Sequence, residues 1–432
     1  MAEYAGWNSV FTLGSHYICE RFLQRGATVL WFQSYWSIFT PFVAWRGFKS
    51  LIEQWRIRPA PIGKNLYGFS PFTFFPYRNF SCLRSKTVGS HTLRVTFPPV
   101  SWWLKHNGWA EPDLLWITAA DLVTLPEFIN CKHIVYRITD NYVAFDHIPP
   151  GFADLENRLI QKADVVITTF SAALERAKAQ RENNTYLLPN AVDTSRFESP
   201  KPTLIMHKIP QPRIIYLGSL EYWVDCDLLY RIATLRPEYS FVLAGPPPQR
   251  PLASLAKLGS LANVHFLGGV EQHLVPGLLQ EADVAIIPYV RDPHTHNSSP
   301  LKLYEYLAAG LPVVSTELKE VMASEAPVLF GRSAEEFAAA IDKALTMGKG
   351  RQEFLDFASE NSWEKRRLRP GWQQAAGRVL ADLPQDFFLV AADLPYALQG
   401  RKLHQYLEDI LDKRDTRQAP VNAQVRAGHG GE

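Results

Sequence analysis

The chain has 432 residues, of which 47% are hydrophobic and 20% are charged, and its net charge is +2. At about 150 residues per domain, this length predicts two or three globular domains with a large buried core. The near-balanced charge gives no indication of a nucleic-acid partner. The four cysteines form no CxxC pair, so we expect no zinc site and no disulfide framework, and a reducing compartment is the simplest interpretation.

The start of the chain and its hydropathy predict a cytoplasmic protein. The first residues, MAEYAGWNSVF, lack the basic start and the apolar centre of a signal peptide. A helix that crosses a bilayer needs about 18 consecutive apolar residues, and no such run occurs in the sequence.

Short β-branched runs alternate with helical segments along the whole chain. The first half has predicted strands at 28–32, 114–118, 134–138, 165–168 and 186–188, and predicted helices at 15–25, 120–130, 152–162 and 171–180. The second half has predicted strands at 213–217, 240–244, 264–267, 284–288 and 313–316, and predicted helices at 227–235, 272–280, 301–309 and 334–346. This alternation predicts an α/β fold with parallel sheets that carry helices on both faces.

The stretch NSSPLKLYEYLAAGLPVVST, residues 297–316, carries the chemistry expected of a phosphate and ribose site. Ser298 and Ser299 form a polar turn before a predicted helix, and the free N–H groups at such a helix start attract anions. Lys302 adds a positive charge in the first turn. Glu305, one turn later, faces the same way and can accept hydrogen bonds from sugar hydroxyls. This pattern indicates a nucleoside diphosphate ligand.

The same stretch resembles the donor-binding signature of bacterial family 4-type glycosyltransferases, and above all the teichuronic acid type, which carries an SPxKLYEYLAAGxPVV run. It is similar, more loosely, to the xanthan-type glucuronosyltransferases. The resemblance covers residues 10–370 and implies the GT-B fold, in which two Rossmann-like domains face each other across a cleft. It implies a donor site made of Gly218, Ser219, Phe266, Leu267, Tyr289, Ser298, Ser299, Lys302, Leu303 and Glu305.

The resemblance also gives the expected domain organisation. Four prolines between residues 198 and 213 indicate a linker. We therefore predict an acceptor-binding domain at 1–198, the linker at 199–212 and a nucleotide-sugar domain at 213–362. A helix at 363–383 would cross back to the first domain, and 384–432 would form an extension with a disordered tail. The first strand of the first domain is missing, unusually short or lost to a late start codon.

Asp140 is the predicted general base. It follows a predicted strand in VYRITDN, which resembles a VYRxSD segment of the xanthan-type enzymes whose Asp has this role. Transfer to a hydroxyl needs a group that accepts the proton. The alternative is that Asp140 caps the next turn. Arg137, inside the strand, is expected to be structural or to pair with an acid.

A second candidate group is TLGSHY, residues 12–17, a glycine loop that leads into a helix. Gly14 allows close backbone approach and Ser15 can cap the helix. We place Gly14, Ser15 and His16 on the acceptor side, with His16 as an alternative base or as a donor to phosphate. The alternative is that His16 is simply packed.

Two departures from the resembling families affect the donor site. The Arg and Lys that usually follow the first glycine loop of the second domain are replaced here by Glu221, Tyr222 and Trp223, so phosphate charge would rest mainly on Lys302. Asn297 stands where the first Glu of the usual pair is expected. The sugar and the stereochemical outcome therefore stay open.

Aromatic and basic residues gather between Trp31 and Trp109, and they suit either a membrane interface or core packing. We call this set the aromatic belt; it comprises Trp36, Phe39, Phe42, Trp45, Arg46, Phe48, Lys49, Trp55, Arg56, Arg58, Trp102, Trp103, Lys105 and Trp109. Asp225-Cys226-Asp227 imitates a DxD metal motif, but Asp is also a good helix cap, and GT-B enzymes generally need no such metal. We expect no metal and no cofactor.

These observations predict a metal-independent glycosyltransferase. Lys302 would stabilise the leaving diphosphate, Asp140 would deprotonate the acceptor and Glu305 would hold the ribose. The expected donor is a nucleoside diphosphate sugar, most simply a UDP-sugar. The expected acceptor is a saccharide or a lipid-linked saccharide in cell-surface polysaccharide synthesis, reached at the inner face of the membrane. The alternatives are a sugar-nucleotide epimerase on the same fold and a catalytically degenerate, membrane-associated assembly protein.

Overall fold

The computed structural model describes residues 2–3, 14–24, 26–37, 58–79, 82–119, 122–144, 148–248, 253–366, 373–374 and 377. The chain divides into two compact units, Met1–Leu383 and Pro384–Glu432. The second unit, with its predicted extension and tail, lies outside the described residues. The predicted boundaries within the first unit stay predictions.

The first half of the chain forms an eight-stranded sheet in the order β11-β10-β9-β8-β1-β2-β5-β4. Its strands are β1 (Ala2–Glu3), β2 (Val29–Gln33), β4 (Ala60–Gly63), β5 (Leu66–Phe69), β8 (Leu114–Ile117), β9 (His133–Ile138), β10 (Val165–Thr168) and β11 (Thr185–Leu187). All neighbouring strands are parallel except β4 and β5. The helices α1 (Gly14–Gln24), α6 (Phe152–Lys162) and α7 (Ser171–Gln180) connect these strands.

The strands of this sheet are continuous apolar runs, as expected for parallel strands that are covered on both faces. All four residues of β10 are buried, and so are the last five of β9. Helix α6 buries one face through Phe152, Leu155 and Leu159, which recur at helical spacing. The predicted fold class is confirmed by this architecture.

The first strand is unusually short, and this resolves one of the alternatives left open by the sequence. β1 has two residues and pairs in parallel with both β2 and β8. It therefore occupies the centre of the sheet.

A smaller sheet joins β3 (Trp36–Ser37), β6 (Phe72–Thr73) and β7 (Thr96–Phe97). Two short helices lie next to it in sequence, α4 (Lys86–His91) and α5 (Val100–His106). The sequence patterns did not predict these elements. The predicted helix at 120–130 is wrong over its described part, 122–130, which holds only a short 3-10 helix, Leu125–Glu127. Pro126 explains the difference, because proline donates no backbone hydrogen bond and disrupts a helix interior.

The second half forms a six-stranded sheet in the order β14-β13-β12-β15-β16-β17, with all neighbours parallel. Its strands are β12 (Arg213–Leu217), β13 (Ser240–Ala244), β14 (Val264–Gly268), β15 (Val284–Ile287), β16 (Val313–Ser315) and β17 (Val328–Phe330). Its helices are α9 (Cys226–Leu235), α10 (Ala253–Leu258), α11 (Val275–Gln280), α12 (Pro293–His296), α13 (Leu301–Ala308), α14 (Lys319–Ala323), α15 (Ala334–Met347) and α16 (Gln352–Glu360).

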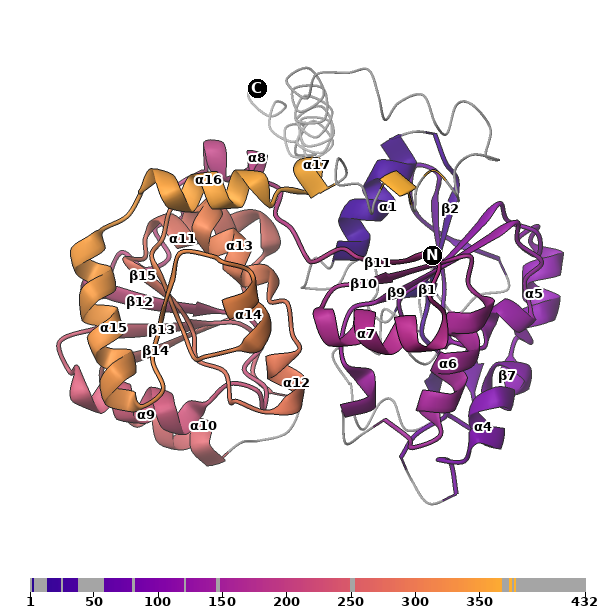
Figure 1. Ribbon diagram of the computed structural model, residues 1–432, viewed down its shortest axis with the longest axis horizontal. Helices are drawn as coiled ribbons and strands as arrows, with labels where there is room; N and C mark the ends of the chain where they lie inside the picture. Colours follow the sequence, from indigo (N-terminus) through magenta and orange to yellow (C-terminus); the bar gives the residue numbers. More distant parts are fainter. Residues whose placement is uncertain are drawn as a thin grey trace, which may run out of the picture. The chain divides into compact units, whose positions relative to one another are not determined.

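Helices cover both faces of this six-stranded sheet. α9 packs against α10 and α15, and α13 packs against α16 (Figure 1). The strand order reverses between β12 and β15, because β13 and β14 extend the sheet on one side while β15 to β17 extend it on the other. In open parallel sheets, ligands bind at the carboxyl ends of the strands at such a switch point.

After α16 the chain returns to the end of the first half. Val192 forms a parallel bridge with Ser362, and the Trp363 N–H donates to the Val192 carbonyl at 3.0 Å. Trp363 begins the short helix α17 (Trp363–Arg366) and stacks on Tyr17 of α1, with ring centroids 5.8 Å apart. The remainder of the predicted 363–383 helix lies almost entirely outside the described residues.

Candidate nucleotide-binding site

Lys302 lies at the switch point of the six-stranded sheet. Its amino group is 4.0 Å from the ring centroid of Tyr216, on β12, and 4.9 Å from that of Tyr289, two residues beyond the end of β15. Lys302 is the second residue of α13. The predicted cradle is therefore built from the ends of two neighbouring strands and the start of a helix, which offers free N–H groups to an anion.

Burial changes the chemistry of this lysine. It lowers the pKa of the Lys302 amine to about 7, while the Glu305 carboxylate partly opposes the shift. A buried cation without a strong counter-ion loses its hydration. An anion bound beside this amine would form an ion pair with it and favour its charged form.

Gly218 makes room for the Lys302 amino group. A Cβ at Gly218 would lie 2.6 Å from the Lys302 Nζ, and the φ angle of this glycine is +138°. The backbone conformation therefore favours glycine here, and an added Cβ would force the Lys302 amino group to move. Ser219 follows it, and the Ser219 carbonyl accepts a hydrogen bond from the Tyr216 hydroxyl at 2.9 Å.

Glu305 is held by side chains from other parts of the chain. The Arg196 Nη1 lies 3.6 Å from the Glu305 Oε1, and the side-chain amide of Gln272 lies 3.3 Å from the same oxygen. Burial raises the pKa of the Glu305 carboxyl, whereas Arg196, Gln272 and Lys302 lower it. The carboxylate keeps 15% of its side-chain surface exposed.

The other predicted donor residues take several positions. Ser298 and Ser299 precede Pro300, the N-cap of α13, and the Ser299 carbonyl accepts a hydrogen bond from Asn190 Nδ2 at 2.7 Å. Phe266 and Leu267 lie on the edge strand β14, and Phe266 is exposed. The side chain of Leu303 is buried in the hydrophobic core, and its role in donor binding stays a prediction.

Asn297, which replaces an expected Glu, has a local structural role. It is the C-cap of α12, and its Nδ2 donates to the Pro293 carbonyl at 2.6 Å.

Asp140 lies two residues beyond the end of β9, as predicted. Burial raises the pKa of its carboxyl, and the nearby His294, Thr139 and Arg137 oppose this shift. A raised pKa brings a carboxylate closer to neutral pH, where a general base works best. Burial lowers the pKa of the His294 imidazole on α12, whereas the nearby Asp140 raises it.

The predicted acceptor-side residues begin α1. His16 is buried and its ring packs against Trp31 of β2, with centroids 4.9 Å apart. The Ser15 hydroxyl lies 3.3 Å from that of Thr118. A Cβ at Gly14 would meet the Arg137 guanidinium at 2.9 Å. His16 is therefore packed inside the protein, as the alternative interpretation expected. A catalytic role of His16 stays a prediction.

Arg137 has the structural position that the sequence suggested. It is buried on β9, and its Nη2 donates to the Asn190 Oδ1 at 3.0 Å. Because Asn190 also contacts Ser299, this amide links β9 to the loop before α13.

The capping alternative is confirmed for the DxD-like motif. The Asp225 carboxylate caps α9 by accepting a hydrogen bond from the Leu228 N–H at 2.8 Å.

Among the residues of the aromatic belt that the structure describes, some are buried in the core and others lie at the surface. Trp36 and Trp103 are buried, and Trp103 stacks on Phe69. Trp102 is exposed and stacks on His106. Belt residues 39–56 lie outside the described residues. No helix in the described part of the chain is long and apolar enough to cross a membrane.

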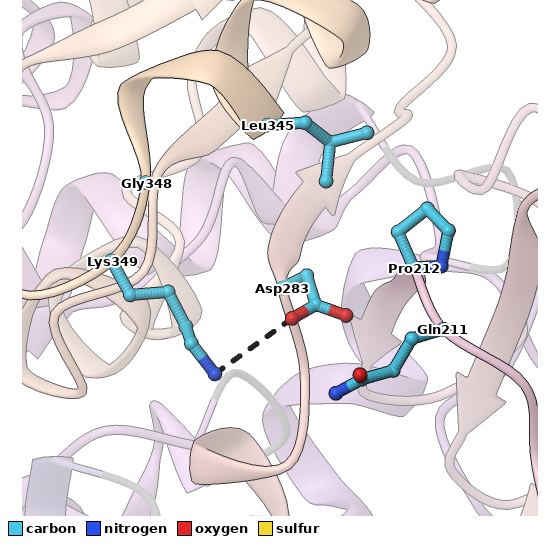
Figure 2. A pocket seen from close by; sticks show the side chains of 6 residues that line it. All are labelled: Gln211, Pro212, Asp283, Leu345, Gly348 and Lys349. Atoms are coloured by element: carbon cyan, nitrogen blue, oxygen red, sulfur yellow. Dashed lines mark ion pairs between the residues drawn. The ribbon is translucent and has the colours of Figure 1, made fainter.

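A pocket of about 400 Å³ lies at the amino ends of β12 and β15 in the six-stranded sheet. Figure 2 shows its lining residues, Gln211, Pro212, Asp283, Leu345, Gly348 and Lys349. Pro212 directly precedes β12 and Asp283 directly precedes β15. Lys349 pairs with Asp283 at 3.8 Å and donates to the carbonyls of Gln280 and Ala282, close to the end of α11. These contacts are structural, and the pocket is remote from Lys302.

Sequence reasoning missed Arg196, Gln272, Tyr17 and Tyr216. Arg196 belongs to the segment LLPNAVDTSRF, which the resemblance marks as the end of the first domain. No local pattern in that segment distinguishes this arginine from a surface cation. The contacts with Glu305 become visible only when the chain is folded.

Known proteins resemble this chain in sequence and in structure. Residues 211–347 match the family described as Glycosyl transferases group 1. The protein named as a teichuronic acid biosynthesis glycosyltransferase, TuaH, of Bacillus subtilis is 26% identical over 260 residues, 54% of this chain and 64% of TuaH. A GDP-mannose-dependent alpha-(1-6)-phosphatidylinositol dimannoside mannosyltransferase of Mycobacterium tuberculosis is 28% identical over 253 residues, 54% of this chain and 61% of the mannosyltransferase.

The chain thus spans less than two thirds of the length of these two relatives. Among solved structures, that of Anabaena Alr3699/HepE in complex with UDP and glucose superposes with a TM-score of 0.53 at 16% identity, covering 91% of this chain and 98% of the other. Residues 211–347 of this chain are therefore a glycosyltransferase group 1 domain, carried by a chain that has the GT-B fold.

Proposed function

We propose that this protein is a glycosyltransferase that moves a sugar from a nucleoside diphosphate donor to a hydroxyl group. The observation that carries the proposal is the position of Lys302 at the start of α13, over the Tyr216 and Tyr289 rings at the switch point of the sheet. Glu305, one turn later on the same helix, supplies the acceptor oxygens for a sugar diol. The match of this region to a glycosyltransferase domain supports the same activity.

The donor is a nucleoside diphosphate sugar, and we propose a UDP-sugar. Alr3699/HepE was solved with UDP, which favours UDP, whereas the mycobacterial relative is named for GDP-mannose, so both nucleotides belong in the test. The acceptor that we propose is a saccharide or a lipid-linked saccharide in cell-surface polysaccharide synthesis. The name of TuaH, which refers to teichuronic acid biosynthesis, supports this class of acceptor.

Three residues divide the work of the transfer. As the bond between the sugar and the diphosphate breaks, negative charge develops on the leaving phosphate, and Lys302 with the N–H groups of α13 stabilises it. Asp140 removes the proton from the acceptor hydroxyl. Glu305 fixes the ribose. No metal enters this scheme, because the cation at the leaving group is the lysine.

Peripheral contact with the inner face of the membrane belongs to the same proposal. Phe74, Phe75, Phe97 and Trp102 are each about half exposed. Phe72 pairs with Phe97 between β6 and β7, and the rings of Phe72 and Phe74 have centroids 4.7 Å apart. Exposed aromatic side chains that gather in one region suit a lipid interface. Cosedimentation with phosphatidylglycerol vesicles should decrease when Phe74 and Phe75 are both replaced by serine.

The activity is tested by incubating the protein with radiolabelled UDP-sugars and GDP-sugars, with and without a membrane extract that supplies lipid-linked saccharides. Transfer of label to the extract, and its loss in Lys302→Ala, is the expected result. Conversion of the sugar without any acceptor would favour the epimerase. Nucleotide binding without turnover would favour the degenerate assembly protein. Full turnover by Lys302→Ala would contradict the role of Lys302.

A further inference from the structure

Arg196 connects four segments of the chain around the Glu305 carboxylate. It lies on the short helix α8 (Ser195–Glu198). Its Nη1 donates to the Tyr17 hydroxyl of α1 at 2.8 Å, and its Nη2 donates to the main-chain carbonyl of Gln272 at 2.7 Å. The same guanidinium pairs with Glu305 at 3.6 Å. The hydrogen bonds to Tyr17 and Gln272 hold the guanidinium in the orientation in which it faces the Glu305 carboxylate.

The contacts leave Glu305 with one oxygen committed and one available. Arg196 and the Gln272 side chain both contact Oε1. Among the described residues, no hydrogen bond or ion pair of the Glu305 side chain involves Oε2. A carboxylate that binds a diol must present its oxygens in a defined direction and must stay ionised, because a protonated oxygen is a poorer acceptor. Arg196 satisfies both requirements, since it fixes Oε1 and favours the charged form.

We propose that Arg196 is a positioning residue that orients the Glu305 carboxylate toward the ribose diol of the donor nucleotide. This inference rests on the proposed function, in which Glu305 binds the ribose. Arg196 itself acts through Glu305 and touches neither the phosphates nor the reacting sugar. Its removal should therefore weaken the recognition of the diol and leave the recognition of the diphosphate intact.

The test compares UDP with 2′,3′-dideoxy-UDP, and GDP with its dideoxy analogue, by calorimetric titration. For the wild-type protein we expect the nucleotide with the diol to bind about tenfold more tightly or better, the size of a hydrogen bond to a charged group. Arg196→Gln should lose most of this preference, with the affinity for the dideoxy analogue nearly unchanged. Arg196→Lys retains the positive charge but cannot make both hydrogen bonds, to Tyr17 and to the Gln272 carbonyl. It should therefore keep an intermediate preference for the nucleotide with the diol.

A matched control is Arg236, which pairs with the Asp342 carboxylate through a hydrogen bond from Nε to Oδ1 at 2.9 Å. It lies in the same half of the chain as Glu305 but joins α9 to α15, away from the site. Arg236→Gln should lower the thermal stability without changing the preference for the diol. This comparison separates the loss of an arginine–carboxylate pair as such from the loss of this particular pair.

The outcomes distinguish the inference from the function on which it rests. If both Arg196 variants bind the two analogues more weakly by the same factor, or keep the wild-type preference, the positioning role is wrong while donor binding stands. If the wild-type protein binds UDP and its dideoxy analogue equally, Glu305 does not read the diol and the inference fails with it. If the wild-type protein binds none of the nucleotides, the proposed function itself is overturned.

Discussion

Donor binding should be accompanied by the uptake of a proton at Lys302. In the free protein, burial lowers the pKa of this amine to about 7, so only about one tenth of the molecules carry the charge at pH 8. A bound diphosphate favours the charged form and raises the pKa again. Each binding event at pH 8 should therefore take up about 0.9 proton, and at pH 7 about 0.5.

Titration calorimetry measures this proton directly. The observed binding enthalpy depends on the ionisation enthalpy of the buffer, and the slope is the number of protons exchanged. We would titrate UDP and GDP in Tris and in HEPES at pH 7 and pH 8, where a phosphate with a second pKa of about 6 adds little to the slope. Above pH 8 the apparent affinity should fall by about tenfold for each pH unit.

The control for this experiment is a second lysine over a tyrosine ring. The Lys257 amino group lies 4.3 Å from the ring centroid of Tyr230, away from the site. Lys257→Met should behave like the wild-type protein, whereas Lys302→Met should bind weakly and without proton uptake. Tight binding at pH 8 with a slope near zero would refute the reasoning, because Lys302 would then be charged before the ligand arrives or would not meet the phosphates.

Three further predictions concern other residues. Asp140→Asn should reduce kcat about 100-fold without changing the nucleotide affinity, and an undiminished kcat would exclude Asp140 as the base. Gly218→Ala should abolish nucleotide binding through its clash with Lys302, while Gly268→Ala, at a glycine with a φ of +71° and nothing within 4 Å of an added Cβ, should retain it; equal losses in both variants would mean that backbone strain alone is responsible. Glu156→Gln should cost about 3 kcal/mol in urea unfolding, because the carboxylate accepts from Tyr136 at 2.8 Å and pairs with Arg176 at 3.0 Å; a change below about 0.5 kcal/mol would show that this buried pair contributes little.

Five of the six strands of the second half could be predicted from the sequence, whereas β17 and the helices α10, α12, α14 and α16 were not predicted. The predicted strands 213–217 and 240–244 are confirmed residue for residue. Such strands are buried on both faces, so their sequences are continuous β-branched and apolar runs between turn residues. The helix that carries Lys302 ends where Gly310, with a φ of +72°, stops it.

The first half was harder because its elements are short. β1 consists of Ala2 and Glu3, neither of which favours a strand, and it is fixed by its neighbours β2 and β8. The small sheet of β3, β6 and β7 has two residues in each strand, too few for an alternating pattern to emerge. Tertiary pairing decides such elements, and a local pattern cannot reveal it.

The candidate site shows the same division between local and long-range information. Lys302 and Glu305 are three residues apart on one helix, so their common direction follows from helical geometry. Tyr216 and Arg196 reach the same place from distant parts of the sequence, and only the fold brings them there. The replacement of the usual Arg and Lys by Glu221, Tyr222 and Trp223 removes positive charge from one loop. The charge of the folded site also depends on Arg196, which comes from another part of the chain.

The most direct test of the central claim is the thermal shift of the wild-type protein and of Lys302→Met against UDP, GDP, TDP and their sugars. A ligand that binds only the native state raises the melting temperature by mass action. We predict that one nucleotide and its sugars stabilise the wild-type protein and that Lys302→Met loses this response. An equal shift in both proteins, or no shift with any nucleotide, would contradict a donor site built around Lys302.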